Sequence, residues 1–183
     1  MNKIKVIFLF FIAAFCTNAQ TVTIKGNAPS YQYKEIAVWL TNDYISNTQR
    51  QITYSVIDSL GNFLLEFNTK DIQYITLKIE KNIASMYAEP NANYEIKIAA
   101  PDSITYQNPN TEHDVEISIN IKSRTEINSL TMDYDKRFDN FLGVDYKSFV
   151  SRTPHPKIDS FKIAMRNFYS TVNNKYLDRK SVV

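Results

Sequence analysis

The chain has 183 residues, of which 44% are apolar, 13% aromatic and 22% charged, and its formal net charge at pH 7 is +2. This apolar content excludes a wholly disordered chain, and the length suits one domain with an additional segment. A single cysteine excludes an intramolecular disulfide, a four-cysteine zinc site and a Cys-x-x-Cys pair within the chain. The only glycines are Gly26, Gly61 and Gly143, and their spacing excludes the glycine-rich loops that bind phosphates.

The first 19 residues have the pattern of a secretory signal peptide. Lys3 and Lys5 precede an unbroken apolar run, VIFLFFIAAF, which is too short to span a membrane. Thr17 and Ala19 are small residues at the positions that favour cleavage before Gln20. We therefore expect an exported protein of the periplasm or outer cell envelope. Loss of the two lysines leaves 19 basic and 19 acidic side chains, so the mature chain has no basic excess for nucleic acid.

Cys16 raises a second interpretation of this segment, because a lipoprotein signal also places a cysteine after an apolar run. Lipoprotein signals have a small residue directly before that cysteine, whereas Phe15 is bulky. The sequence therefore favours cleavage over lipid anchoring at Cys16. No second apolar run long enough to span a membrane follows.

Residues 20–122 show the alternation of apolar and polar side chains that is typical of β-strands. About eight short runs of this kind are separated by turn residues, and Gly61 suits a hairpin turn that needs a positive φ. These features predict a mainly β fold, an antiparallel β-sandwich in which each sheet buries one face. The expected strands cover residues 21–25, 35–41, 52–58, 62–67, 74–80, 83–89, 94–98 and 115–121.

The expected core of this sandwich consists of side chains at alternating strand positions: Val22, Ile24, Val38, Leu40, Tyr54, Val56, Phe63, Leu65, Phe67, Ile75, Leu77, Ile79, Ile96 and Ile98. Four aromatic residues near the first strands, Tyr31, Tyr33, Trp39 and Tyr44, form the candidate binding surface. Aromatic rings on a sandwich face stack on sugars or pack against a partner protein. Because no polar constellation accompanies these four residues, the sequence favours filling the core or covering a sheet edge over ligand binding for them.

After residue 122 the period changes to the spacing of three and four residues that is typical of helices. Thr125 is the expected N-cap of the first helix. A helix with one strongly aromatic face needs a partner surface, so we expect the two helices to pack against something more than each other. The two apolar stripes are Ile127, Leu130, Tyr134, Phe138 and Phe141, and then Ile158, Phe161, Met165, Phe168, Val172 and Tyr176.

The remaining polar residues match no catalytic or metal-binding motif. His113 is flanked by two acidic residues, but adjacent turn residues seldom converge on one ion, so we expect a solvated turn there. His155 lies between two prolines and is expected in an exposed loop. Asp133 and Asp135 do not face each other on a helix and are expected on its surface. The sequence thus predicts no catalytic residue, no cofactor and no metal site.

Four short motifs carry a resemblance to a known family: TIKG at residues 23–26, DSLGNF at 58–63, YAEPN at 87–91 and YEIKI at 94–98. The segment that contains them is similar to a domain of uncharacterised function that precedes thioredoxin-like domains in exported Bacteroidota proteins. Asn91 departs from that family, in which glycine or a small residue usually follows the proline. The resemblance implies a non-catalytic docking domain, with residues 123–177 as a helical spacer and a redox domain beyond them. Its implied partners are an envelope protein or its own redox domain.

The last six residues, DRKSVV, interrupt the second apolar stripe without a helix stop signal. They match the translation of one frame of a common sequencing adapter, GAT-CGG-AAG-AGC-GTC-GTG, which a TAG stop codon follows. We therefore expect residues 178–183 to be non-native and the natural chain to continue past residue 177. The alternative interpretations are a stand-alone secreted binding module for a glycan or a protein, and a structural or adhesion subunit.

Overall fold

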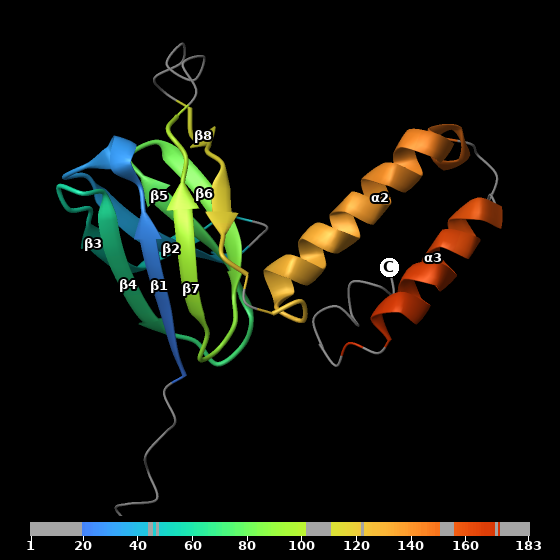
Figure 1. Ribbon diagram of the computed structural model, residues 1–183, viewed down its shortest axis with the longest axis horizontal. Coiled ribbons are helices and arrows are strands. Elements are labelled where there is room, and N and C mark those ends of the chain that lie inside the picture. The colour runs from blue at the N-terminus through green and yellow to red at the C-terminus, as the bar shows by residue number, and fades with distance from the viewer. Residues whose placement is uncertain are drawn as a thin grey trace, which may run out of the picture.

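The computed structural model describes residues 20–43, 46, 48–101, 111–121, 123–150, 156–170 and 172. Within these residues two β-sheets pack face to face, and a pair of helices extends from one side of them (Figure 1). Several predictions fall outside the described residues: the signal peptide with Cys16, the aromatic residue Tyr44, His155, the end of the second apolar stripe and the six-residue tail.

Nine strands occur in the described residues, and most neighbouring pairs are antiparallel. The parallel pairs are β1 with β7 and β6 with β8. A mainly β sandwich followed by a helical segment, as the sequence predicts, is confirmed. The first sheet has the order β4 (Asn62–Asn68), β1 (Thr21–Asn27), β7 (Asn93–Ile98) and β9 (Ile117–Ile119), and the second has the order β3 (Thr48–Val56), β2 (Glu35–Asp43), β5 (Gln73–Ile79), β6 (Asn82–Ala88) and β8 (His113–Asp114).

The sandwich core contains most of the predicted side chains, because alternate residues of β1, β4, β5 and β7 point between the sheets. Leu40 is half-buried at its margin. The prediction is wrong for Tyr54 and Val56, which are 61% and 60% exposed. These two residues pair with Ala37 and Glu35 of β2 and share the outer face of the sheet with them. Alternation shows which residues share a face, but it does not show whether that face is covered.

Two glycines are needed, one where the chain turns and one where the ring of a paired residue on the neighbouring strand lies over the backbone. Gly61 has φ +85° in the loop between β3 and β4, a backbone conformation that favours glycine. The Asp58 carboxylate supports this turn by accepting the N–H groups of Leu60 and Asn62 at 2.8 and 2.7 Å. At Gly26 a Cβ atom would lie 2.0 Å from Phe63 Cζ, so the missing side chain makes room for the ring.

The helical pair consists of α2 (Ile127–Val150) and α3 (Pro156–Tyr169), which pack through aromatic rings. Phe161 of α3 stacks on Phe141 of α2 with ring centroids 4.4 Å apart. Glu126 caps α2, because its Oε2 atom accepts the N–H of Ser129 at 3.1 Å. The expected cap, Thr125, instead has its hydroxyl 2.8 Å from the hydroxyl of Ser123, so that prediction is wrong. The Glu126 carboxylate reaches the N–H of Ser129 in the first turn, whereas the Thr125 hydroxyl is directed to Ser123.

Candidate functional site

The structure does not bring the described members of the predicted aromatic cluster together. Tyr31 ends a short 3-10 helix, η1 (Pro29–Tyr31), and its ring is buried in the sandwich core. Tyr33 is 72% exposed and has φ +63°. Trp39 is half-buried on the outer face of the five-stranded sheet, six residues along the chain from Tyr33. Tyr33 lies before β2, and the part of β2 from Glu35 to Trp39 alone spans about 13 Å, so these two rings do not form one platform.

A different set of aromatic residues shares the outer face of the five-stranded sheet with Trp39. Tyr54, Tyr74 and Tyr87 all alternate with inward-pointing neighbours, so their rings lie on the outer face. The rings of Tyr74 and Tyr87 are 5.0 Å apart. Lys78 Nζ lies 5.2 Å from the centroid of the Trp39 ring, a cation–π distance. We call these four aromatic residues the outer aromatic face. The alternation of their strands was the sequence signal that could have identified them.

The helical pair joins the sandwich through one buried side chain, Asn128, which is 5% exposed. The Oδ1 atom of Asn128 accepts the N–H of Tyr87 at 2.8 Å, and its Nδ2 atom donates to the Tyr87 carbonyl at 2.9 Å. The amide thus takes the place that a neighbouring strand would occupy at the edge of β6. We call this double contact the Asn128 clamp. It ties the first turn of α2 to the sheet at a defined point.

A second polar contact surrounds the clamp. Asn128 Nδ2 also donates to Glu126 Oε1 at 2.5 Å, and the Glu126 carboxylate interacts with the hydroxyl of Tyr94 on β7. The same hydroxyl accepts the N–H of Glu89 at 2.8 Å. Burial, reinforced by the two nearby carboxylates, raises the pKa of Tyr94 above its ordinary value, so the hydroxyl stays protonated and able to donate. The start of α2 is therefore bound to strands of both sheets.

A small apolar cluster lies where the helices meet the sandwich. Its buried members are Ile127, Leu130, Met165 and Tyr169, and Tyr87 packs against them from β6. Further along the helices, the hydroxyl of Tyr169 and the Nε atom of Arg137 both donate to Asp133 Oδ2, at 2.7 and 2.8 Å. Burial and the Asp133 carboxylate raise the pKa of Tyr169. These contacts hold α3 against α2, and we interpret them as structural.

A groove of about 480 Å³ opens beside the clamp, between β6, β9 and the first turns of α2. Its lining is mainly apolar and includes Met86, Ile117, Ile119 and Met132, with Thr131 and Asn128 as polar residues. Met132 is 62% exposed on the helical wall. An apolar groove with a few polar groups at the boundary of two structural units is a usual place for a partner segment to bind.

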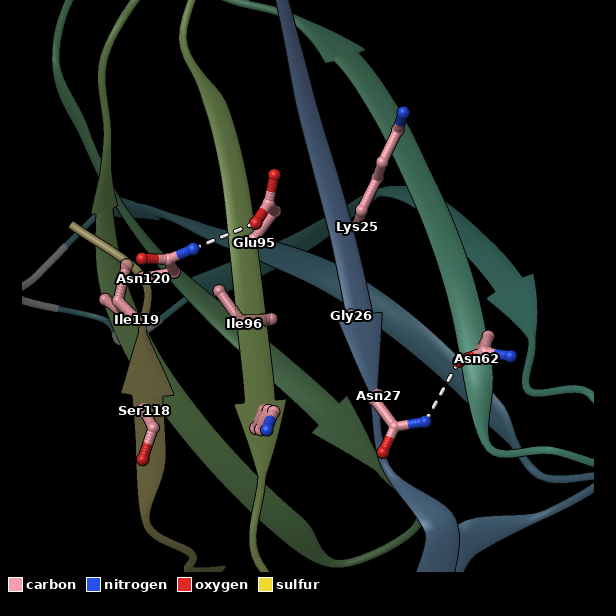
Figure 2. Close-up of a pocket in the computed structure, with 10 residues that line it drawn as sticks. Lys25, Gly26, Asn27, Asn62, Glu95, Ile96, Ser118, Ile119 and Asn120 are labelled. Carbon is pink, nitrogen blue, oxygen red and sulfur yellow. Dashed lines mark hydrogen bonds between the residues drawn. The ribbon is translucent and has the colours of Figure 1, made fainter. Parts of the chain in front are cut away.

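A second hollow, of about 500 Å³, lies on the outer face of the four-stranded sheet (Figure 2). Four of its polar side chains form two hydrogen-bonded pairs. Asn27 Nδ2 donates to Asn62 Oδ1 at 3.0 Å, and Asn120 Nδ2 donates to Glu95 Oε2 at 2.9 Å. Because these amides are already paired and no aromatic ring lines the hollow, we interpret it as a solvated sheet face.

The acidic residues around His113 do not converge on a metal. Glu112 forms an ion pair with Lys78 at 2.6 Å, and His113 and Asp114 form β8 beside β6. No group of three metal-ligating side chains occurs in the part of the chain that the structure describes. Within the same ranges, neither helix is long and apolar enough to cross a membrane.

No protein-family model matches the chain, and no curated protein matches it significantly.

Proposed function

We propose that this chain is a non-catalytic docking domain of an exported thioredoxin-like thiol:disulfide oxidoreductase. In this role the β-sandwich is the folded support, the helical pair is the spacer, and the spacer sets the position of a redox domain that follows it. The reactive cysteines belong to that following domain. This chain therefore positions the redox domain and contacts it, and electron transfer takes place within the redox domain.

The observation that supports this proposal most directly is the Asn128 clamp. A flexible linker between two domains would need no buried contact at its first turn. Here a buried amide binds both main-chain groups of Tyr87, and an apolar cluster around Ile127 packs beside it. Such contacts hold the helices in one direction relative to the sandwich, which is what a spacer must do to position a second domain.

The decisive experiment is to sequence the genomic DNA across the 3′ end of the gene. We expect the codons after that of residue 177 to differ from the adapter sequence and to continue in frame into a domain with Cys-x-x-Cys or a single reactive cysteine. A genomic stop codon directly after residue 183 would overturn the proposal.

The outer aromatic face supports a second candidate function, a stand-alone secreted module that binds a glycan or a protein. Tyr54 and Tyr74 are 61% and 44% exposed, and hydroxyl groups of Thr76 and Ser85 lie between the aromatic positions. Exposed rings with nearby hydroxyls are suitable for stacking on sugars. A glycan array probed with the unmodified chain and with Tyr74→Ala tests this function. Binding that Tyr74→Ala abolishes would support this second function. If the unmodified chain binds no glycan on the array, the glycan-binding function is excluded.

A further inference from the structure

The edge of β6 is uncovered at one residue, Ser85, which lines the groove beside the Asn128 clamp. Every second residue of β6 directs its main-chain groups away from β5. The Ile83 carbonyl accepts the N–H of Val115 at 2.8 Å, and both main-chain groups of Tyr87 bind the clamp. Ser85 lies between these two residues, so its N–H and C=O groups point to the same edge. Among the described residues these two groups have no partner.

The chain leaves this edge because it changes sheets. After β8 it passes from β6 to the other sheet, where β9 is the last strand and pairs with β7. Ala99, directly after β7, donates its N–H to the Glu116 carbonyl at 3.0 Å, so Glu116 and every second residue after it face β7. Ile117 and Ile119 therefore direct their main-chain groups away from β7. The groove thus has main-chain donors and acceptors on two walls, at Ser85 and on β9.

Apolar side chains surround these main-chain groups. Ile117 and Ile119 are half-buried and pack against the sandwich core, and Met86 lines the groove from β6. On the helical wall, Met132 of α2 is 62% exposed. An extended peptide suits such a groove, because its main chain pairs with a sheet edge while alternate side chains enter the apolar space.

The charged side chains along the groove are acidic. Glu116 is the charged residue among the described lining residues. On α2, Asp135 and Asp139 continue the helix face that lines the groove, because residues spaced by three and four share a face. Lys136 belongs to another side of the helix, where it interacts with Asp133. An acidic rim favours a cationic partner and disfavours an anionic one.

We propose that this groove binds an extended, basic peptide segment of another protein. The main chain of the peptide pairs with Ile117 and Ile119 of β9, which adds one strand to the four-stranded sheet. Its apolar side chains enter the groove, and its lysine or arginine side chains lie at the acidic rim. The Asn128 clamp holds α2 as the helical wall of this site. The site consists of this chain's own residues, so it does not depend on the redox domain proposed above.

Two short synthetic peptides test the chemistry of the partner: one alternates valine and lysine, and the other alternates valine and glutamate. Fluorescence anisotropy of each labelled peptide, titrated with the unmodified chain, measures binding. We expect saturable, salt-sensitive binding of the lysine peptide and no binding of the glutamate peptide. Glu116→Gln combined with Asp135→Asn should weaken binding about fivefold, because two exposed ion pairs are lost. Glu35→Gln combined with Glu66→Gln removes the same charge at exposed positions outside the groove and is the matched control.

A second pair of measurements tests the strand pairing. Methylation of the main-chain nitrogens at every second residue removes the N–H donors along one edge of the lysine peptide. One of the two possible methylated forms should therefore bind about tenfold more weakly than the unmodified peptide. The bound peptide should also slow amide hydrogen exchange at Ile117 and Ile119, and leave β4, at the other edge of the same sheet, unchanged.

Four results would each overturn the proposal. The first is an absence of saturable binding of the lysine peptide, and the second is equal binding of the lysine and glutamate peptides. The third is undiminished binding of both methylated forms, because the peptide would then not pair through its main chain. The fourth is slowed exchange at β4 in place of β9, because a different sheet edge would then bind the peptide.

Discussion

The sandwich and the helical pair are stabilised in different ways. Nineteen buried residues form one continuous core between the two sheets, whereas four buried residues form the cluster at the base of the helices. Hydrophobic stabilisation grows with the apolar area removed from water, so burial stabilises the sandwich more than it stabilises the helical pair. The helices depend instead on the Asn128 clamp, the Glu126 cap and aromatic contacts along one seam. We therefore expect the sandwich to fold as the stable unit and the helices to open before it.

The largest expected effect comes from truncating the sandwich core. Leu77 is 1% exposed at the centre of β5, and Leu77→Ala leaves a cavity that costs about 3 kcal/mol of unfolding free energy. Because both sheets enclose this position, the whole chain should lose stability together. Urea denaturation followed by circular dichroism measures the change. Leu60→Ala, at a position 73% exposed, is the control and should have little effect.

Removing the clamp should separate the two regions. Asn128→Ala leaves the buried N–H and C=O groups of Tyr87 without their partner, at a cost of about 2 kcal/mol. Amide hydrogen exchange should accelerate in α2 and α3 and at Tyr87, while β1 and β5 keep their protection. Asn140→Ala, at an exposed position of α2, is the matched control. Equal acceleration in the sandwich would show that the two regions unfold as one unit.

The strands of the sandwich could be predicted from the sequence, because the alternation of apolar and polar residues is visible within each strand. In β4, Phe63, Leu65 and Phe67 alternate with polar or exposed residues, and all three are buried as expected. The same pattern in β3 led to a wrong prediction for Tyr54 and Val56. Both strands alternate and both lie at the edge of their sheets, but Tyr54 and Val56 share the outer face with Ala37 and Glu35 of β2. Which face of a strand is covered depends on residues far away in the chain.

The contacts of the candidate site were less predictable for the same reason. Asn128 and Tyr87 are 41 residues apart, so no local pattern connects them. The helical stripe that includes Ile127 correctly indicated a helix, but it did not show that a neighbouring amide would bind a strand edge. The clustering of Tyr31, Tyr33 and Trp39 in the sequence was misleading as a spatial argument, because one ring is buried and the other two lie at separate places.

A smaller effect should appear in the helical pair on acidification. The Arg137 side chain, and then the Tyr169 hydroxyl, hold the pKa of Asp133 below its ordinary value of 3.8. The unfolded chain therefore binds this proton first as the pH falls, so the contribution is present above the unfolded pKa and is lost as the pH falls through the native pKa. Asp133 is 40% exposed, which limits the contribution to less than about 1 kcal/mol. Comparing Asp133→Asn with the unmodified chain at neutral pH and at about pH 3 measures it: the difference should shrink at the lower pH.

The smallest expected effect is a gain of stability in the sandwich. Tyr33 has φ +63°, its N–H donates to the Ile57 carbonyl at 2.9 Å, and its side chain is 72% exposed. This is the bulge geometry in which glycine is preferred, and the ring gains little from burial there. Tyr33→Gly should therefore relieve backbone strain and stabilise the chain by about 0.5 kcal/mol, net of the entropy that glycine adds to the unfolded state. The gain should appear in the urea midpoint of the sandwich and leave hydrogen exchange in α3 unchanged. A loss of stability instead would show that the Tyr33 ring makes a favourable contact that outweighs the backbone strain at this position.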